Sequence, residues 1–173
     1  MAKPPGWFFV SLADHWAMSA EYRRSLDAEA RQALEHPEAI PILVISKYKR
    51  DSPESGVAPS ITVYDESTHA IGERSALELL QGSMSALKPF ASDMSLTEEP
   101  TSLMVPGANS AAASLWSYSE PVEGEYVRVR TRTILTVIQG HALTFHFFMQ
   151  EGAPRSVAQE LRNAERTITF AEA

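Results

Sequence analysis

Hydrophobic runs in the first third of the chain predict three strands. Residues 40–48 are an almost unbroken series of aliphatic and β-branched side chains, typical of a central strand covered on both faces. After a polar loop over residues 50–59, residues 60–65 alternate between apolar and polar and predict a returning strand. Residues 7–12 are aromatic and apolar enough for a further strand, which a turn over residues 13–18 would end.

The second half of the chain predicts a set of neighbouring antiparallel strands. Three long runs of alternating or apolar residues follow one another, at residues 110–119, 125–138 and 141–150, after a weaker candidate at residues 102–105. The separators at residues 121–124 and at Gln139-Gly140 are short enough for hairpins. The last two runs are therefore expected to pair antiparallel.

Helical periodicity appears in three segments. Residues 19–35 place apolar side chains along one side of a helix. The second helix begins at Ser75, because Glu78 three residues later completes a capping box. In the third, residues 156–166, Ser156 and Gln159 form a second capping box, and a short extended segment follows.

The order of these elements indicates an α+β fold. Runs of adjacent antiparallel strands interrupted by helices favour one mainly antiparallel sheet over a doubly wound parallel one. We expect about six or seven strands with helices on both faces, an α/β/α sandwich. The chain has 173 residues and no repeat or linker, which predicts a single domain over 1–173 with 1–6 as a loose lead-in.

Composition narrows the classes of function. The chain contains no cysteine, which excludes disulfides, thiolate metal sites, iron–sulfur clusters and cysteine nucleophiles. The net charge of −7 argues against non-specific nucleic-acid binding. No apolar run approaches the roughly 20 residues that span a bilayer. As written, the chain predicts a cytoplasmic protein, or an exported, periplasmic one if a signal segment has been removed.

Catalytic and metal-binding motifs are absent from the sequence. There is no Gly-x-Ser-x-Gly elbow, no Gly-x-Gly phosphate loop, no His-Glu-x-x-His helix and no calcium loop. His141 and His146 are five residues apart on one predicted strand and would point to opposite faces. Asp65, Glu66 and His69 could bind a cation, although a solvated loop is the plainer interpretation. We therefore predict no catalytic residue, no metal and no cofactor.

Arginine recurs at every second position in the first half of the predicted strand 125–138. Alternation places Arg128, Arg130 and Arg132 on one face, within about 14 Å of one another. The other face carries apolar residues, among them Val127, Val129, Leu135 and Val137. Aligned guanidinium groups can hold a carboxylate or a phosphate. The alternative is an exposed strand face whose arginines pair with nearby glutamates, namely Glu120, Glu123 and Glu125.

Several segments, taken in order, suggest a family. FFVSLADHW (8–16) resembles a strand followed by a Pro-Asp-Gly-Trp turn, with Ala13 in place of the proline and His15 in place of the glycine. IPILVISKY and SITVYD resemble the next hairpin, and YVRVRTRTILTVIQGHALTFHFF resembles a later one. The helix 157–166 and the segment 167–170 resemble a terminal helix and closing strand. This series resembles the PsbP-like fold, shared by photosystem II extrinsic proteins, Mog-type nuclear-import factors and small bacterial proteins.

The resemblance implies a sheet of about seven antiparallel strands between helices. It implies little chemistry, because members of this group act mostly as binding, assembly or chaperone-like modules, and some bacterial ones are thought to be secretion-system adaptors. The group has no shared catalytic motif. Roles carried over in this way are fold-level analogy.

Three hypotheses for function follow. The first is a non-enzymatic protein-binding, adaptor or chaperone-like module that contacts another protein, with an acidic surface, through Arg128, Arg130 and Arg132. The second is a carrier of a small anionic or amphiphilic ligand, held in an apolar pocket near Ile134, Ile138 and Phe148. The third and least supported is an enzyme, which would require Asp65, His69 or His146 to converge in a cleft.

Overall fold

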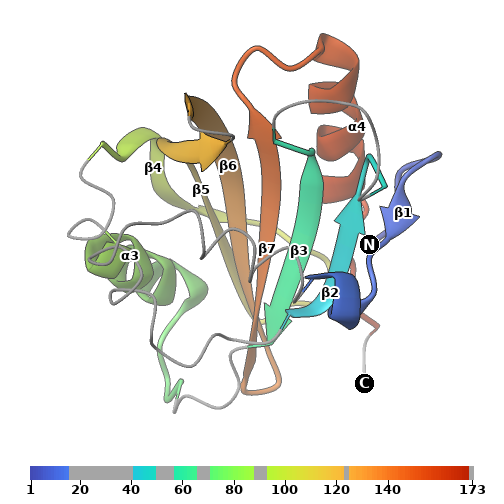
Figure 1. The fold of residues 1–173 in the computed structure, drawn as a ribbon. Coiled ribbons are helices and arrows are strands. Elements are labelled where there is room, and N and C mark those ends of the chain that lie inside the picture. The colour runs from blue at the N-terminus through green and yellow to red at the C-terminus, as the bar shows by residue number, and fades with distance from the viewer. Residues whose placement is uncertain (16–40, 50–56, 66–70, 88–92, 123–124, 172–173) are drawn as a thin grey trace.

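The computed structural model describes residues 1–15, 41–49, 57–65, 71–87, 93–122 and 125–171. They form seven strands and two longer helices (Figure 1). The strands are β1 (Phe8–Phe9), β2 (Pro41–Ser46), β3 (Ser60–Asp65), β4 (Ser95–Leu103), β5 (Ser110–Val122), β6 (Glu125–Ile138) and β7 (His141–Gln150). The helices are α3 (Ala76–Leu87) and α4 (Arg155–Glu165).

The seven strands form one sheet in the order β1-β2-β3-β7-β6-β5-β4. All six neighbouring pairs are antiparallel. The β6–β7 hairpin closes at Ile138↔His141, and the two turn residues Gln139 and Gly140 both have positive φ, as a type I′ turn requires. The sheet-dominated α+β fold and the two predicted C-terminal hairpins are confirmed.

Three strand predictions need correction. β5 continues to Val122, which pairs with Glu125, although residues 121–124 were expected to form the separator. β4 has nine residues, where only a short strand at 102–105 was expected. Its side chains are mostly exposed and its ladder is irregular at two places, so no clean alternation marks it. β1 is confined to two residues, and the backbone is already helical at residues 12–15.

The two predicted capping boxes have different outcomes. At α3 the Ser75 backbone N–H donates to Glu78 Oε2 (2.8 Å), and the Glu78 N–H donates to Ser75 Oγ (3.3 Å), which confirms the box. At α4 the N-cap is Pro154, without a side-chain hydrogen bond, so the prediction for Ser156 and Gln159 is wrong. Proline fixes φ near the value that a helix entry needs. The helix predicted over 19–35 lies outside the described residues.

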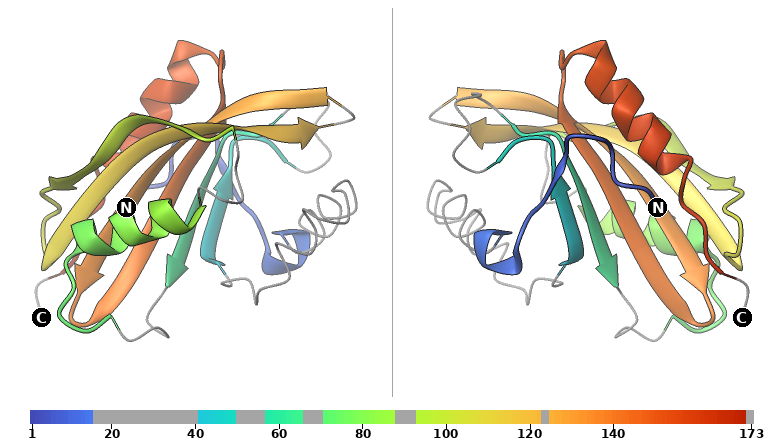
Figure 2. Two further views of the ribbon diagram at one scale, coloured as in Figure 1. Left: turned by 90° about the vertical axis from the view of Figure 1, so that its left-hand side faces the viewer. Right: turned by 90° about the vertical axis from the view of Figure 1, so that its right-hand side faces the viewer.

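Two separate clusters of buried side chains form the core. One joins α4 to the sheet, and its members include Ile45, Ile61, Ile134, Phe145, Phe147, Val157 and Leu161. The other joins α3 to the sheet through Leu80, Met84, Ala112, Trp116, Leu135 and Ala142. Because Ile134 and Leu135 are adjacent in β6, they point to opposite faces of the sheet. Figure 2 shows the two helices and the sheet from two sides.

Candidate functional site

β6 carries the predicted arginines on one face, together with Ile134. The residues that alternate with them are covered, since Val129 and Leu135 are buried and Val127 and Val137 are half-buried. Arg130 and Arg132 lie beside residues of α4, and alternation along β6 places Arg128 on the same face of the sheet. The first half of β6 therefore has one cationic face and one apolar face, as expected. Beyond Arg132 both faces are apolar or carry threonine.

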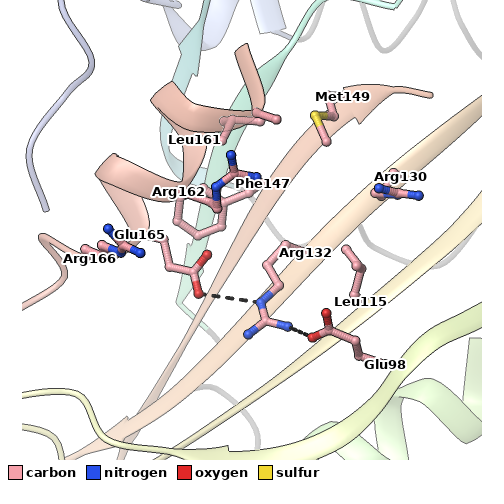
Figure 3. A pocket seen from close by; sticks show the side chains of 11 residues that line it. Glu98, Leu115, Arg130, Arg132, Phe147, Met149, Leu161, Arg162, Glu165 and Arg166 are labelled. Atoms are coloured by element: carbon pink, nitrogen blue, oxygen red, sulfur yellow. Dashed lines mark hydrogen bonds and ion pairs between the residues drawn. The ribbon is translucent and has the colours of Figure 1, made fainter. Parts of the chain in front are cut away.

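Arg132 joins the sheet to α4 (Figure 3). Its guanidinium forms an ion pair and a hydrogen bond with Glu98 on the edge strand β4. Its Nε lies 3.5 Å from Oε1 of Glu165, in the last turn of α4. One cation thus lies between a carboxylate from β4 and one from α4, and all three side chains keep only part of their surface exposed. Arg132 therefore has a structural role at this junction.

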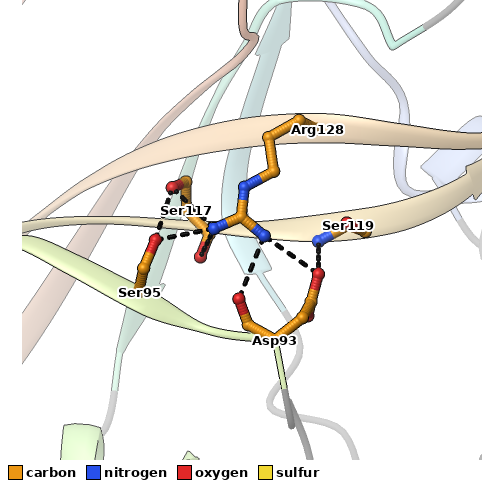
Figure 4. Close-up of polar contacts among 5 residues, drawn as sticks. All are labelled: Asp93, Ser95, Ser117, Ser119 and Arg128. Atoms are coloured by element: carbon orange, nitrogen blue, oxygen red, sulfur yellow. Dashed lines mark hydrogen bonds and ion pairs between the residues drawn. The ribbon is translucent and has the colours of Figure 1, made fainter.

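Arg128 is also held by its neighbours, at the other end of the arginine face (Figure 4). Its Nη1 donates to Oδ2 of Asp93 (2.9 Å) and to the Asp93 carbonyl oxygen (3.0 Å). Its Nη2 donates to Oγ of Ser95 (2.6 Å) and to Oγ (3.2 Å) and the carbonyl oxygen (3.3 Å) of Ser117. Both terminal nitrogens are thus engaged, which leaves little capacity for a ligand.

Asp93 is fixed from a second side. The Ser119 backbone N–H donates to its Oδ2 over 2.7 Å. Partial burial acts to raise the pKa of the Asp93 carboxyl, but the hydrogen bonds from Ser119 and the positive charge of Arg128 outweigh it and hold that pKa below its usual value. The carboxylate therefore stays ionised opposite Arg128 at neutral pH.

Arg130 has a different environment from its two neighbours. Its closest carboxylate oxygen is Oε1 of Glu151, 3.9 Å from Nη2, and 41% of its side chain is exposed. Its Nε is buried and, within the described residues, has no hydrogen-bond partner. An unsatisfied buried donor costs about 1–3 kcal/mol, and more when the group is charged. Because Nε itself is covered, a ligand oxygen would meet the exposed part of the Arg130 side chain, whose guanidinium has one long ion pair among the described residues.

A pocket of about 330 Å³ opens beside Arg130, between α4 and the sheet (Figure 3). Four arginines and two glutamates line it, together with an apolar floor. The lining residues are Glu98, Leu115, Arg130, Arg132, Phe147, Met149, Ala158, Leu161, Arg162, Glu165 and Arg166. Arg130 and Arg132 come from β6, whereas Arg162 and Arg166 come from α4 and its C-terminal end. Such a mixture of cationic and apolar walls suits an anionic group attached to an apolar one.

The glutamates predicted as partners of the arginines are the wrong ones. Glu120 pairs with Val127 in the ladder, so it lies on the opposite face, where the Tyr118 hydroxyl donates to it over 3.3 Å. Glu125 alternates with the arginines along β6 and also belongs to that face. Glu123 lies outside the described residues. The carboxylates observed beside the arginines belong to Asp93, Glu98, Glu151 and Glu165.

Sequence reasoning missed the contribution of α4 to the pocket. Arg162 and Arg166 are four residues apart, a spacing that places two helical side chains on the same side. That spacing was a usable signal for a cationic ridge. It did not indicate which sheet residues the ridge would meet, because α4 and β6 are separated in sequence by β7 and a turn.

Ile134, Ile138 and Phe148, the residues near which an apolar pocket was predicted, do not share one face of the sheet. Ile134 is buried in the core cluster beneath α4. Phe148 alternates with Phe147 and belongs to the opposite face, with its ring centroid 6.3 Å from that of Tyr118. None of the three lines the pocket beside Arg130. An apolar floor exists there, but other residues supply it.

His146 lies on the sheet face opposite the arginines. Its Nδ1 is 3.1 Å from Oγ1 of Thr133, which accepts a hydrogen bond from Trp116 Nε1 over 3.0 Å. Burial lowers the pKa of His146 to about 4, so the ring is neutral at physiological pH. His69, its possible companion, lies outside the described residues. In the part of the chain that the structure describes, no three His, Asp or Glu side chains gather as metal ligands would.

Comparisons with known proteins show a fold and no family. No family model matches the chain, and no curated protein matches it. Among solved structures, PA94 of Pseudomonas aeruginosa, a candidate regulator of unknown function, has a TM-score of 0.56 at 10% identity over 81% of this chain and 89% of that one. LpqN of Mycobacterium tuberculosis, involved in cell envelope biogenesis, has a TM-score of 0.49 at 16% identity over 97% and 78%.

A likeness at such low identity concerns the fold alone, so the functions of these proteins are not carried over. The PsbP-like resemblance remains a prediction, since neither structure is described by that fold name. A membrane-spanning helix was not expected, and within the described ranges no helix has the length and apolar character for one. The chain shares its overall fold with PA94, and its site must be interpreted from its own residues.

Proposed function

We propose that the chain is a non-enzymatic protein-binding or adaptor module that binds an acidic group of its partner in the pocket beside Arg130. The observation that carries this proposal is the guanidinium of Arg130, which lines the pocket and, among the described residues, has one long ion pair, with Glu151 at 3.9 Å. A partner carboxylate would accept from the exposed N–H groups of this guanidinium and form a charge-assisted hydrogen bond. Arg128 and Arg132 support the site from either side but already hold carboxylates of the chain itself.

The charge distribution supports an acidic partner group. The chain carries a net charge of −7, so most of its surface repels an acidic partner. The pocket gathers four arginines against two lining glutamates and is locally cationic. Local complementarity on a like-charged background favours one docking orientation over others. The partner is therefore expected to approach through an acidic group of limited size.

The carrier of a small amphiphilic ligand is the second candidate. The observation that favours it is the apolar floor, in which Phe147 and Leu161 are buried while Met149 is half-buried. A volume of about 330 Å³ lies at the lower end of the range for small-molecule pockets. The enzyme remains the least supported of the three hypotheses.

We also infer the finer architecture, an α/β/α sandwich of the PsbP-like type. The support is that buried residues of α3 cluster with Leu135, and buried residues of α4 cluster with the neighbouring Ile134. The β6–β7 hairpin followed by α4 is in the order that the resemblance implies, although residues 167–170 do not form the closing strand that it also implies. A cytoplasmic location, or export after loss of a signal segment, stays a prediction.

The protein-binding function is tested by charge reversal at the pocket. Tagged wild-type chain, Arg130→Glu and Arg155→Glu are used to recover partners from the native cells, and the recovered proteins are quantified by mass spectrometry. Arg155 is a matched control, because it is exposed at the first residue of α4 and does not line the pocket. A specific partner should be recovered with the wild type and with Arg155→Glu but lost with Arg130→Glu.

Titration calorimetry with a purified partner then measures how much Arg130 contributes to binding. Reversing a charge that contacts an acidic group should weaken binding about tenfold to a hundredfold, since charge-assisted hydrogen bonds contribute about 1.5–3 kcal/mol. The Arg155→Glu control should keep the wild-type Kd. Equal Kd values for the wild type and a folded Arg130→Glu variant would remove this surface from the interface.

A further inference from the structure

We infer that the group recognised in the pocket is a single carboxylate carried on an apolar chain, such as the C-terminal end of a polypeptide or an alkyl acid. This inference rests on the proposed function, because it specifies the chemistry of the group bound at the same site. Three observations carry it: exposed guanidinium donors, a balance of charges that leaves room for one negative charge, and an apolar floor beside them.

The donors face each other across the pocket. Arg130 reaches it from β6, with 41% of its side chain exposed and one long ion pair, with Glu151, among the described residues. Arg162 reaches it from α4; its Nη2 donates to Oε1 of Gln159 over 3.0 Å, which leaves further N–H groups on the same guanidinium. Figure 3 shows these two guanidinium groups on different sides of the pocket. A carboxylate with two oxygens can accept from both.

The charges in and around the pocket favour a monoanion. Glu98 and Glu165 lie with Arg132 and together leave that group negative. Glu151 is not a lining residue, but its Oε1 is 3.9 Å from Nη2 of Arg130. The four lining arginines therefore face three glutamates, an excess of one positive charge. A phosphate dianion would leave these groups with a net negative charge, whereas one carboxylate balances them.

The apolar floor specifies what the carboxylate is attached to. Leu115 from β5, Phe147 and Met149 from β7 and Leu161 from α4 line the pocket beside the arginines. Of these, Phe147 and Leu161 are buried. A small polar acid would leave this floor in contact with water, whereas an aliphatic group covers it and releases that water. The pocket thus offers arginines to the carboxylate of the expected ligand and apolar side chains to its aliphatic part.

Titration calorimetry with defined probes tests the inference. The probes are a short peptide that ends in a free leucine carboxylate, the same peptide with a C-terminal amide, and decanoate. They are titrated into the wild-type chain, Arg130→Gln and the control Arg155→Gln. We expect the free-acid peptide to bind, and the amide or the Arg130→Gln variant to weaken that binding about tenfold or more. Arg155→Gln should behave as the wild type does.

The decanoate arm separates the two sources of the carboxylate. Decanoate binding that matches the free-acid peptide, and that Arg130→Gln abolishes, assigns the pocket to alkyl acids. Weaker decanoate binding assigns it to chain ends. Both outcomes support the shared chemistry.

Three results would overturn the inference: no binding of either carboxylate probe, equal binding of the amide, or unchanged affinity in an Arg130→Gln variant whose thermal unfolding shows that it is folded. A failure of the proposed function gives a different set of results from a failure of this inference. Loss of a protein partner in Arg130→Glu without carboxylate binding would remove this inference alone. Carboxylate binding with full partner recovery by Arg130→Glu would remove only the protein-binding function.

Discussion

Arg128 and Arg130 lie two residues apart on the same face of β6, and their surroundings differ. Arg128 donates to Asp93, Ser95 and Ser117 through both of its terminal nitrogens. Arg130 has a distant carboxylate at 3.9 Å and a buried Nε without a hydrogen-bond partner in the described ranges. The first arginine completes a structural network, and the second retains capacity for binding.

The edge strand β4 causes this difference. It supplies Ser95 to Arg128 and Glu98 to Arg132. Between them its pairing with β5 shifts, since Leu96 pairs with Trp116 and Glu98 pairs with Leu115. A bulge of this kind changes which side chains meet the neighbouring strands. The three arginines are evenly spaced on β6, but they differ in role because β4, two strands away, supplies partners to Arg128 and Arg132.

Replacing each arginine by methionine should separate the two roles most strongly. Arg128→Met removes five hydrogen bonds and leaves Asp93 without its cation, so we expect the free energy of unfolding to fall by about 1–2 kcal/mol. Arg130→Met removes one long ion pair but also removes a buried donor whose lack of a partner costs free energy, so we expect the same quantity to stay level or to rise. Urea unfolding of both variants measures the difference. Equal losses would show that the two environments are energetically alike.

The face of each arginine could be predicted from the sequence, because a strand alternates its side chains with a period of two. Val129 and Leu135 are buried as that period requires, and the guanidinium groups lie on the other side. The hairpin at Gln139-Gly140 was equally predictable, because its two-residue turn is a local feature. Local periodicity was therefore sufficient to predict β6, β7 and their antiparallel pairing.

The partners of the arginines could not be predicted in this way. Asp93 is 35 residues from Arg128, and Glu98 is 34 residues from Arg132. Glu98 belongs to β4 and Asp93 precedes that strand, whose mostly exposed side chains and irregular ladder leave no period to recognise. Glu120 was nearer in sequence, but alternation along β5 turns it to the other face. The pocket results from packing α4 over the sheet, which no pattern within one element encodes.

Arg132 should give an intermediate effect, which sharpens the comparison. Arg132→Met leaves Glu98 and Glu165 without their shared cation, but 56% of the Glu98 side chain is exposed and can be hydrated again. We expect the free energy of unfolding to fall by about 1 kcal/mol. Arg132→Lys should recover part of this loss, because a single ammonium group cannot match the planar fork of a guanidinium with two carboxylates. A free energy of unfolding that stays level or rises, as expected for Arg130→Met, would contradict a structural role for Arg132.

Acid should narrow the difference between Arg128 and Arg130, with the smallest effect of the three. The pKa of Asp93 is lowered in the folded chain, although burial acts to raise it, because the hydrogen bonds from Ser119 and the charge of Arg128 prevail. A carboxyl with a lowered folded pKa stabilises the fold above its unfolded pKa, near 3.8 for aspartate, and this contribution is lost as the pH falls through the folded pKa. With 44% of its side chain exposed, Asp93 should contribute less than about 1 kcal/mol.

Urea unfolding between pH 7 and about pH 3, at low and constant salt, tests this assignment. The stability gap between the wild type and Arg128→Met should be full at neutral pH and narrow below about pH 4. Arg130→Met should keep the pH profile of the wild type, because its guanidinium does not contact Asp93. His146, with its pKa of about 4, titrates in all three proteins, so its contribution cancels in the differences. A gap that stays constant down to the lowest pH would mean that Arg128 stabilises the fold through its serine and carbonyl contacts, and that Asp93 contributes nothing through its charge.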